Sequence, residues 1–163
     1  MTAVPNRQEG GAGNSPSAQF RRPTIVLGVD GSPPSWDAFA WAAGEALRSG
    51  GRIVAVFVSS LAEPGDVVGS TAPLGYAAAV TAKDEMASGL ADEVTNRAET
   101  LGVQLRFLRL QGDASRVLSE VARSEQADLI VVGQSSKMFH RVLGSVSRRL
   151  VLKKGGPVVV VVP

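Results

Sequence analysis

Short apolar runs alternate along this chain with longer segments in which apolar residues recur every three or four positions. The apolar runs lie at 24–30, 53–58, 103–107, 129–132 and 158–162, and each has the length of a strand. The intervening segments have the spacing of amphipathic helices, two of them preceded by the capping residues Ser32 and Asp113. Such an alternation is typical of a parallel sheet with helices on both faces.

The order of the strands follows from how apolar each run is. The third run alternates apolar and polar residues, as an edge strand does, whereas the first, second and fourth are apolar throughout and suit buried positions. These constraints and right-handed crossovers predict a five-stranded parallel open sheet of order 3-2-1-4-5, a Rossmann-like α/β fold. In this order the topological switch point lies between the first and fourth strands, so we expect a ligand beyond Asp30 and Gly133.

The chain divides into a tail and one domain. Residues 1–22 are rich in Gly, Pro, Ser, Asn and Gln without apolar periodicity, and we predict a disordered N-terminal tail. Residues 23–163 have the size of a single domain. Within it, glycines and prolines are frequent at 59–81, which predicts a long loop before the second helix.

Composition excludes several classes of site. The chain has no Cys and one His, His140, which rules out disulfides, a thiolate nucleophile and the common multi-histidine metal sites. No apolar stretch is long enough to span a membrane, so we expect a cytoplasmic protein that binds neither membrane nor nucleic acid. Residues 129–163 contain six Lys and Arg and no acid, which favours an anionic ligand there, although a solvated helix face would look the same.

A glycine- and serine-containing loop follows the fourth strand. It runs from Gly133 to Gly144-Ser145-Val146-Ser147, where a helix is expected to begin. Small residues let the backbone approach a phosphate closely, and the N–H groups at a helix start are natural anion donors. The spacing is neither that of a P-loop nor the GxGxxG of dinucleotide-binding proteins.

Several segments together resemble the universal stress protein family. They are Val29-Asp30-Gly31-Ser32, Gly112-Asp113 through Leu118, Ala127 through Gly133, Gly144-Ser145-Val146-Ser147 and the closing Pro157 through Pro163. They occur in the family's order and cover about residues 23–163. The resemblance implies a five-stranded α/β fold, a homodimer and, in one branch of the family, ATP binding without a P-loop.

The glycine loop departs from the pattern of the ATP-binding members, in which a glycine, two residues, a second glycine, nine residues and Gly-Ser or Gly-Thr follow one another. Ser136 stands where the second glycine belongs, and ten residues separate Gly133 from Gly144 where the pattern has twelve. Two interpretations stay open: a stress-response or signalling protein that binds ATP or another adenine nucleotide, alone or with a divalent cation, and an interaction module that does not bind ATP.

The residues expected to contact a nucleotide follow from this resemblance. Asp30 matches the acidic residue at the nucleoside end, and Val58 matches a position that contacts the base. The full candidate set is Asp30, Val58, Gly133, Ser136, Gly144, Ser145, Val146 and Ser147. Structural alternatives exist for three of them: Asp30 as a turn acceptor, Gly133 as a tight-turn residue and Ser145 as a helix N-cap.

No catalytic constellation is apparent, because 129–163 contains no general base other than His140. We expect a binding protein rather than an enzyme. A transferase or hydrolase of adenylate-type compounds would need a further acid or base, for instance from 59–81. The expected partners are an unidentified protein and a second copy of the chain, paired through Val158 to Val162, since five β-branched residues at a sheet edge favour strand pairing.

Overall fold

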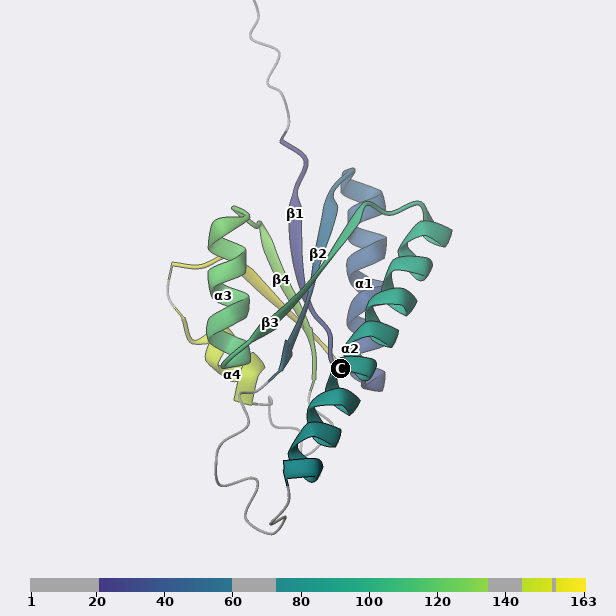
Figure 1. The fold of residues 1–163 in the computed structure, drawn as a ribbon. Helices are drawn as coiled ribbons and strands as arrows, with labels where there is room; N and C mark the ends of the chain where they lie inside the picture. The colour runs from purple at the N-terminus through teal and green to yellow at the C-terminus, as the bar shows by residue number, and fades with distance from the viewer. Residues whose placement is uncertain (1–20, 60–72, 135–144, 154) are drawn as a thin grey trace, which may run out of the picture.

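The computed structural model describes residues 21–59, 73–134, 145–153 and 155–163. Its five strands form one parallel sheet in the order β3-β2-β1-β4-β5, which confirms the predicted topology (Figure 1). The strands are β1 (Thr24–Gly28), β2 (Arg52–Ser59), β3 (Leu105–Gln111), β4 (Leu129–Gly133) and β5 (Val158–Val162). The predicted disordered tail falls almost wholly on residues 1–20, outside the described residues, and stays a prediction.

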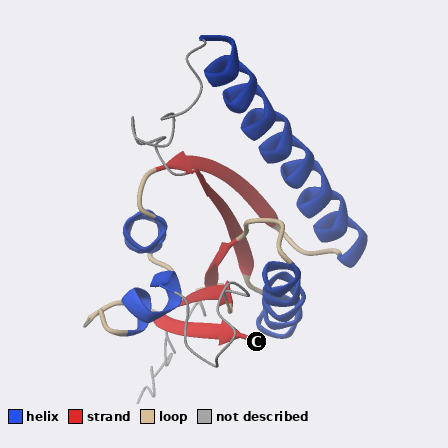
Figure 2. Ribbon diagram, turned by 90° about the horizontal axis from the view of Figure 1, so that it is seen from below, coloured by secondary structure: helices blue, strands red, loops and turns tan. Residues whose placement is uncertain are grey.

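Helices cover both faces of this sheet. They are α1 (Pro33–Ser49), α2 (Pro73–Leu101), α3 (Ala114–Ser124) and α4 (Ser145–Val151). Figure 2, which looks along the sheet from below, shows α1 and α2 on one side of the strands and α3 and α4 on the other. No helix among the described residues is both long enough and apolar enough to cross a membrane.

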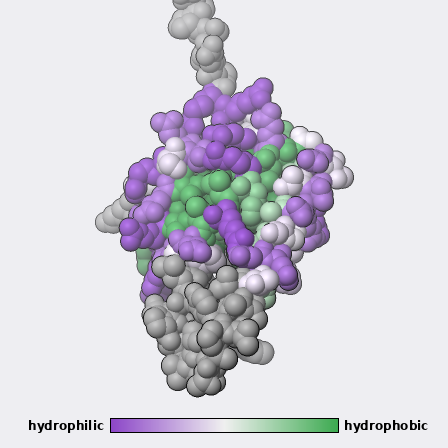
Figure 3. All heavy atoms as spheres, viewed as in Figure 1, coloured by the Kyte–Doolittle hydropathy of each residue, from purple (hydrophilic) through white to green (hydrophobic). Residues whose placement is uncertain are grey.

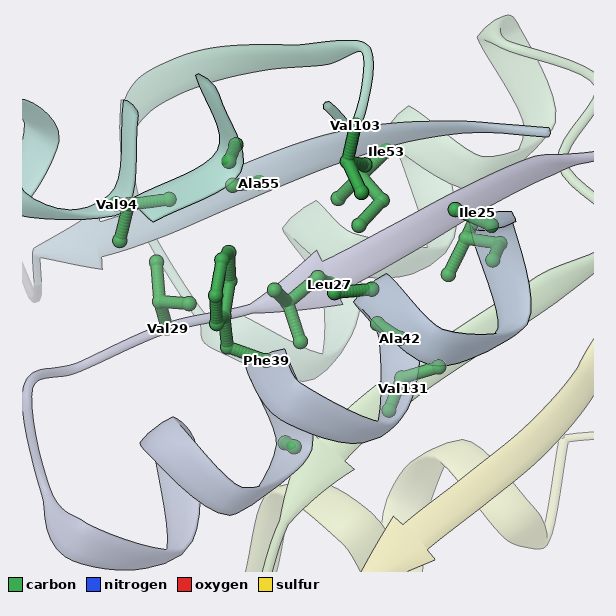
Figure 4. Close-up of a cluster of buried hydrophobic side chains, with 14 of the residues drawn as sticks. Ile25, Leu27, Val29, Phe39, Ala42, Ile53, Ala55, Val94, Val103 and Val131 are labelled. Atoms are coloured by element: carbon green, nitrogen blue, oxygen red, sulfur yellow. The ribbon is translucent and has the colours of Figure 1, made fainter. Parts of the chain in front are cut away.

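Two apolar clusters, one for each face, hold the layers together. Alternate residues of a strand point to opposite faces, so Leu27 packs with α1 and α2 while Val26 packs with α3 and α4. In the first cluster the ring of Phe39 from α1 lies between Leu27 and Val29 (Figure 4). Complete burial of Leu27 and Val26 is what strands covered on both faces require.

The second helix begins earlier than the sequence predicted. The long loop expected at 59–81 is wrong in its last part, because α2 already begins at Pro73. Proline is well placed in the first turn of a helix, where its missing N–H is not needed, and the alanines at 77–79 are strong helix formers. Residues 60–72 lie outside the described residues.

The third strand also continues further than expected, to Gln111 instead of Phe107. Its apolar side changes midway: Leu105 and Phe107 pack on the α1/α2 side, and Leu108 and Leu110 pack on the α3/α4 side. The adjacent apolar pair at 107–108 therefore marks a change of face within one strand, where the sequence suggested an end. Figure 3 faces this edge and shows hydrophobic residues across its middle, between more hydrophilic surfaces.

Candidate functional site

A pocket of about 180 Å³ lies at the carboxyl ends of β1 and β4. The first residues of α1, α3 and α4 also line it, so three helix N-termini face the same space. This is the topological switch point of the sheet, because β2 and β3 lie on one side of β1 while β4 and β5 lie on its other side. Open α/β proteins bind their ligands at such a point. Helix N-termini direct N–H groups and positive partial charge at the pocket, which favours an anionic group.

The pocket contains most of the residues that the sequence singled out. Six of the eight candidates line it: Asp30, Val58, Gly133, Ser145, Val146 and Ser147. The other two, Ser136 and Gly144, lie outside the described residues, as does His140. Four separate segments of the chain supply the six residues, and the sheet topology brings them together.

Asp30 organises the turn that leads from β1 into α1. One carboxylate oxygen, Oδ1, accepts hydrogen bonds from the backbone N–H of Ser32 at 2.9 Å and from the Ser32 hydroxyl at 2.6 Å. Asp30 is therefore an acceptor of the turn, the structural alternative that the sequence offered. This role occupies Oδ1, and the hydrogen bonds recorded among the described residues leave Oδ2 available to a ligand.

The expectation that the Ser32 side chain caps α1 is wrong. Ser32 is the residue before the helix, but its hydroxyl bonds to Asp30 instead of to a backbone N–H of the first turn. The backbone carbonyl of Ser32 accepts from the N–H groups of Ser35 and Trp36. At the start of α3 the cap forms as predicted, with Asp113 accepting from Arg116 N at 2.9 Å.

Gly133 is a glycine because the end of β4 packs against backbone. A Cβ atom at this position would lie 2.8 Å from Ser35 N and closer still to the carbonyl carbon and oxygen of Pro34. Its φ is not in the left-handed region, so no tight turn requires glycine here. The residue brings the first turn of α1 against β4 and so fixes one wall of the pocket.

Another part of the lining is apolar. It consists of Val56, Val58 and Leu118, which pack together on the α3/α4 side of the sheet, and all are buried except Val58, which is half-buried. Gly28 lies at its base, where an added Cβ would meet Leu118 at 3.2 Å. The pocket thus joins an apolar surface to a polar rim of serines and Asp30, a combination typical of small-molecule sites.

A charged contact joins the two helices on the α3/α4 side of the pocket. The Asp113 carboxylate accepts from Ser115 Oγ at 2.5 Å through Oδ1 and from Arg149 Nη1 at 2.7 Å through Oδ2. The Ser115 hydroxyl, the Arg116 N–H and the Arg149 charge together lower the pKa of Asp113 below its ordinary value. Arg149, one of the six basic residues of 129–163, therefore already has an acidic partner and holds α4 against the start of α3.

Sequence reasoning missed several residues of the pocket, of which Ser35 is the most informative. It lies in the first turn of α1, only 4% exposed, and accepts a hydrogen bond from Asp30 N at 3.2 Å. A polar residue at a position of the buried helix face was the one available signal. Gln134, directly after β4, also lines the pocket.

Within the described part of the chain, no group of three acidic or histidine side chains is arranged to hold a metal ion.

Comparison with known proteins identifies relatives along nearly the whole domain. The profile of the universal stress protein family matches residues 22–162. A curated universal stress protein of Methanocaldococcus jannaschii is 29% identical over 139 residues, which are 84% of this chain and 80% of that protein. The universal stress protein UspA of Lactobacillus plantarum has the same fold, with a TM-score of 0.71 and 22% identity over 88% of this chain and 99% of its own.

Some similar structures were solved with a nucleotide. A universal stress protein in complex with cAMP is 26% identical, with a TM-score of 0.65 over 86% of this chain and 97% of its own. Proteins of the same fold from Archaeoglobus fulgidus (22% identical, TM-score 0.56, 87% and 98% covered) and Arabidopsis thaliana (18% identical, TM-score 0.60, 86% and 92% covered) are complexes with dAMP and AMP.

Proposed function

This chain belongs to the universal stress protein family, and from that membership we propose that it is a cytoplasmic adenine-nucleotide-binding protein that acts in stress response or signalling as a homodimer. The observation that carries the proposal is the pocket itself. Six candidate residues from four segments converge at the switch point of the sheet, beside three helix N-termini. The cAMP complex of a relative 26% identical to this chain supports the choice of an adenine nucleotide.

Each part of a nucleotide has a matching surface. The apolar surface of Val56, Val58 and Leu118 suits a flat base. Oδ2 of Asp30 is a charged acceptor, which suits the ribose hydroxyls and disfavours phosphate at that end. Ser145, the first residue of α4, lines the pocket with its hydroxyl and backbone N–H, groups that suit phosphate.

A second candidate function rests on the altered glycine loop. Ser136 replaces the middle glycine, and the loop is two residues shorter than in the ATP-binding members of the family. The described pocket of about 180 Å³ is also smaller than the roughly 300 Å³ at which most small-molecule sites begin. On this alternative the chain is an interaction module that does not bind ATP.

Calorimetric titration with cAMP, AMP, ADP and ATP separates the candidates. Binding of any of the four supports the proposal, and binding of AMP or cAMP without ATP indicates that the loop limits the number of phosphates. No heat with any of them at millimolar concentration would overturn nucleotide binding and leave the interaction module.

The Asp30→Asn variant tests the site. Asparagine keeps the Oδ1 acceptor of the turn and removes the charge at Oδ2, so affinity should fall by about tenfold, as expected for a charged hydrogen bond. Asp37→Asn on the exposed surface of α1 is the matched control and should bind as the wild type does. Equal affinities of the two variants would place the nucleoside away from Asp30.

The homodimer proposal follows from the two edges of the sheet. At the β3 edge, Arg106 and Arg109 pair with Glu125 and Asp84, and charged side chains on an edge strand discourage pairing with another chain. The β5 edge has five valines, the first of them 64% exposed, and no charge. Two copies paired through β5 about a two-fold axis would cover these valines.

A binding role rather than an enzymatic one remains our proposal. The observation that supports a binding role concerns Asp30, the only carboxylate that lines the described pocket. It already accepts two hydrogen bonds in the turn before α1, which suits a structural and binding group better than a general base. Incubation with ATP and Mg²⁺, followed by phosphate release, tests it. Turnover faster than about one per minute, well below typical enzyme rates of 1–1000 per second, would contradict it.

A further inference from the structure

Ser35 is a buried polar residue that lines the pocket. Four polar residues are buried among the described ones, and two of these, Ser35 and Ser147, line the pocket. Ser35 lies in the first turn of α1. A buried hydroxyl at such a place is worth tracing through its hydrogen bonds, because buried polar groups nearly always have partners.

The hydrogen bonds of Ser35 are incomplete on the donor side. Its Oγ accepts from Asp30 N at 3.2 Å, which fixes the position of the oxygen. Within the described ranges, no hydrogen bond is recorded in which the Ser35 hydroxyl donates. Ser119 on α3, also buried, provides the contrast, because its Oγ donates to the Ser115 carbonyl at 2.8 Å and lies away from the pocket.

The position of Ser35 indicates what its hydroxyl would meet. On one side lies Asp30, whose carboxylate suits sugar hydroxyls and repels phosphate. On the other side lies Gly133, whose α-carbon packs directly against Ser35 N, and beyond it the start of α4. Ser35 therefore stands between the sugar end and the phosphate end, at the N-terminus of a helix with no acidic residue in its first turn.

We infer that Ser35 is a ligand-contacting residue: its hydroxyl donates a hydrogen bond to an oxygen of the phosphate attached to the sugar. The inference rests on the proposed nucleotide function. It gives the first turn of α1 a role in binding the phosphate, which the sequence alone did not indicate. A donor held at this point favours a nucleotide over the corresponding nucleoside, however many further phosphates follow.

The test compares AMP with adenosine on matched variants. Ser35→Ala removes the donor, and Ser119→Ala removes a buried helical serine hydroxyl outside the pocket. Affinities come from calorimetry with AMP and from competition against AMP with adenosine. Hydrogen bonds to charged groups imply a loss of about tenfold or more for AMP with Ser35→Ala. The adenosine affinity should change less than about twofold, and Ser119→Ala should change neither.

The ratio of the two affinities is the decisive quantity. Ser35→Ala also leaves Asp30 N without its acceptor, so a purely structural role would weaken AMP and adenosine together and leave their ratio unchanged. That result, or an unchanged AMP affinity, would overturn the inference while nucleotide binding stands. Ser35→Thr retains the hydroxyl and should retain the wild-type ratio. A wild type that binds neither ligand would overturn both the proposed function and this inference.

Discussion

Replacing Gly133 by alanine should destabilise the fold even with no ligand present. The added Cβ would lie 2.8 Å from Ser35 N and closer to the Pro34 carbonyl group, where non-bonded carbon contacts normally measure 3.5–4.0 Å. Relieving this overlap requires β4 and α1 to move apart by about 1 Å. The obstacle is backbone next to the rigid pair Pro33-Pro34, so no side chain can rotate away. Overpacking costs about 1–3 kcal/mol, and we expect a value near 3 kcal/mol here.

Urea unfolding of the apo protein measures this change directly. A loss of about 3 kcal/mol corresponds to a decrease in Tm of roughly 6–12 °C for a protein of this size. Gly89→Ala is the control, because its Cβ would have no neighbour within 4 Å on α2. This control substitution should raise the free energy of unfolding by about 0.5–1 kcal/mol, because alanine has the higher helix propensity. A Gly133→Ala variant with wild-type stability would refute the packing argument and return Gly133 to the role of a phosphate-approach residue.

Two further predictions concern the α3 cap and the β5 edge. Asp113→Ala should cost about 0.5–2 kcal/mol at pH 7, as loss of an N-cap does, whereas Asp92→Ala on exposed α2 should not. The pKa of Asp113 is lowered in the folded state, so the stabilisation that its carboxylate gives is present above the ordinary aspartate pKa and is lost as pH falls through the lowered value. Urea titrations should therefore show the difference in unfolding free energy between wild type and Asp113→Ala shrink as pH falls from the ordinary to the lowered pKa, and stay constant above the ordinary pKa. Val158→Lys should yield folded monomers in sedimentation at micromolar concentration, because Val158 is 64% exposed in one protomer and a lysine there can remain in solvent. Leu47→Lys on the exposed surface of α1 should leave the dimer intact. A wild type that sediments as a monomer would contradict the pairing of β5.

The fold was predictable because burial on both faces leaves a simple mark on a sequence. Strands such as β1 and β4 are apolar at nearly every position, and the alternation of β3 distinguishes an edge. The boundaries were less accessible. The start of α2 at Pro73 depends on a proline that is equally frequent in loops, and the change of face at Phe107-Leu108 depends on α3 lying opposite Leu108.

The site was predictable where it depends on strand ends. Asp30, Val58 and Gly133 lie within two residues of the carboxyl ends of their strands, and these ends of parallel strands meet at one edge of the sheet. Ser35 was not predictable in this way, because its closeness to the pocket depends on how α1 packs against β4. The packing role of Gly133 is also tertiary, since nothing local in φ requires a glycine.

Two separate sets of contacts position the described residues of the pocket. The part that we propose for the nucleoside consists of Asp30, Val56 and Val58 of β2 and the first turn of α1, held by the hydrogen bonds of the turn and by the packing of Gly133 against Pro34. The contact of Arg149 with Asp113 separately joins α4 to the residue before α3. All of these contacts join residues outside 135–144. On our proposal, these described surfaces are the ones that would recognise a nucleoside monophosphate, and the titration series from AMP to ATP tests how far the loop limits further phosphates.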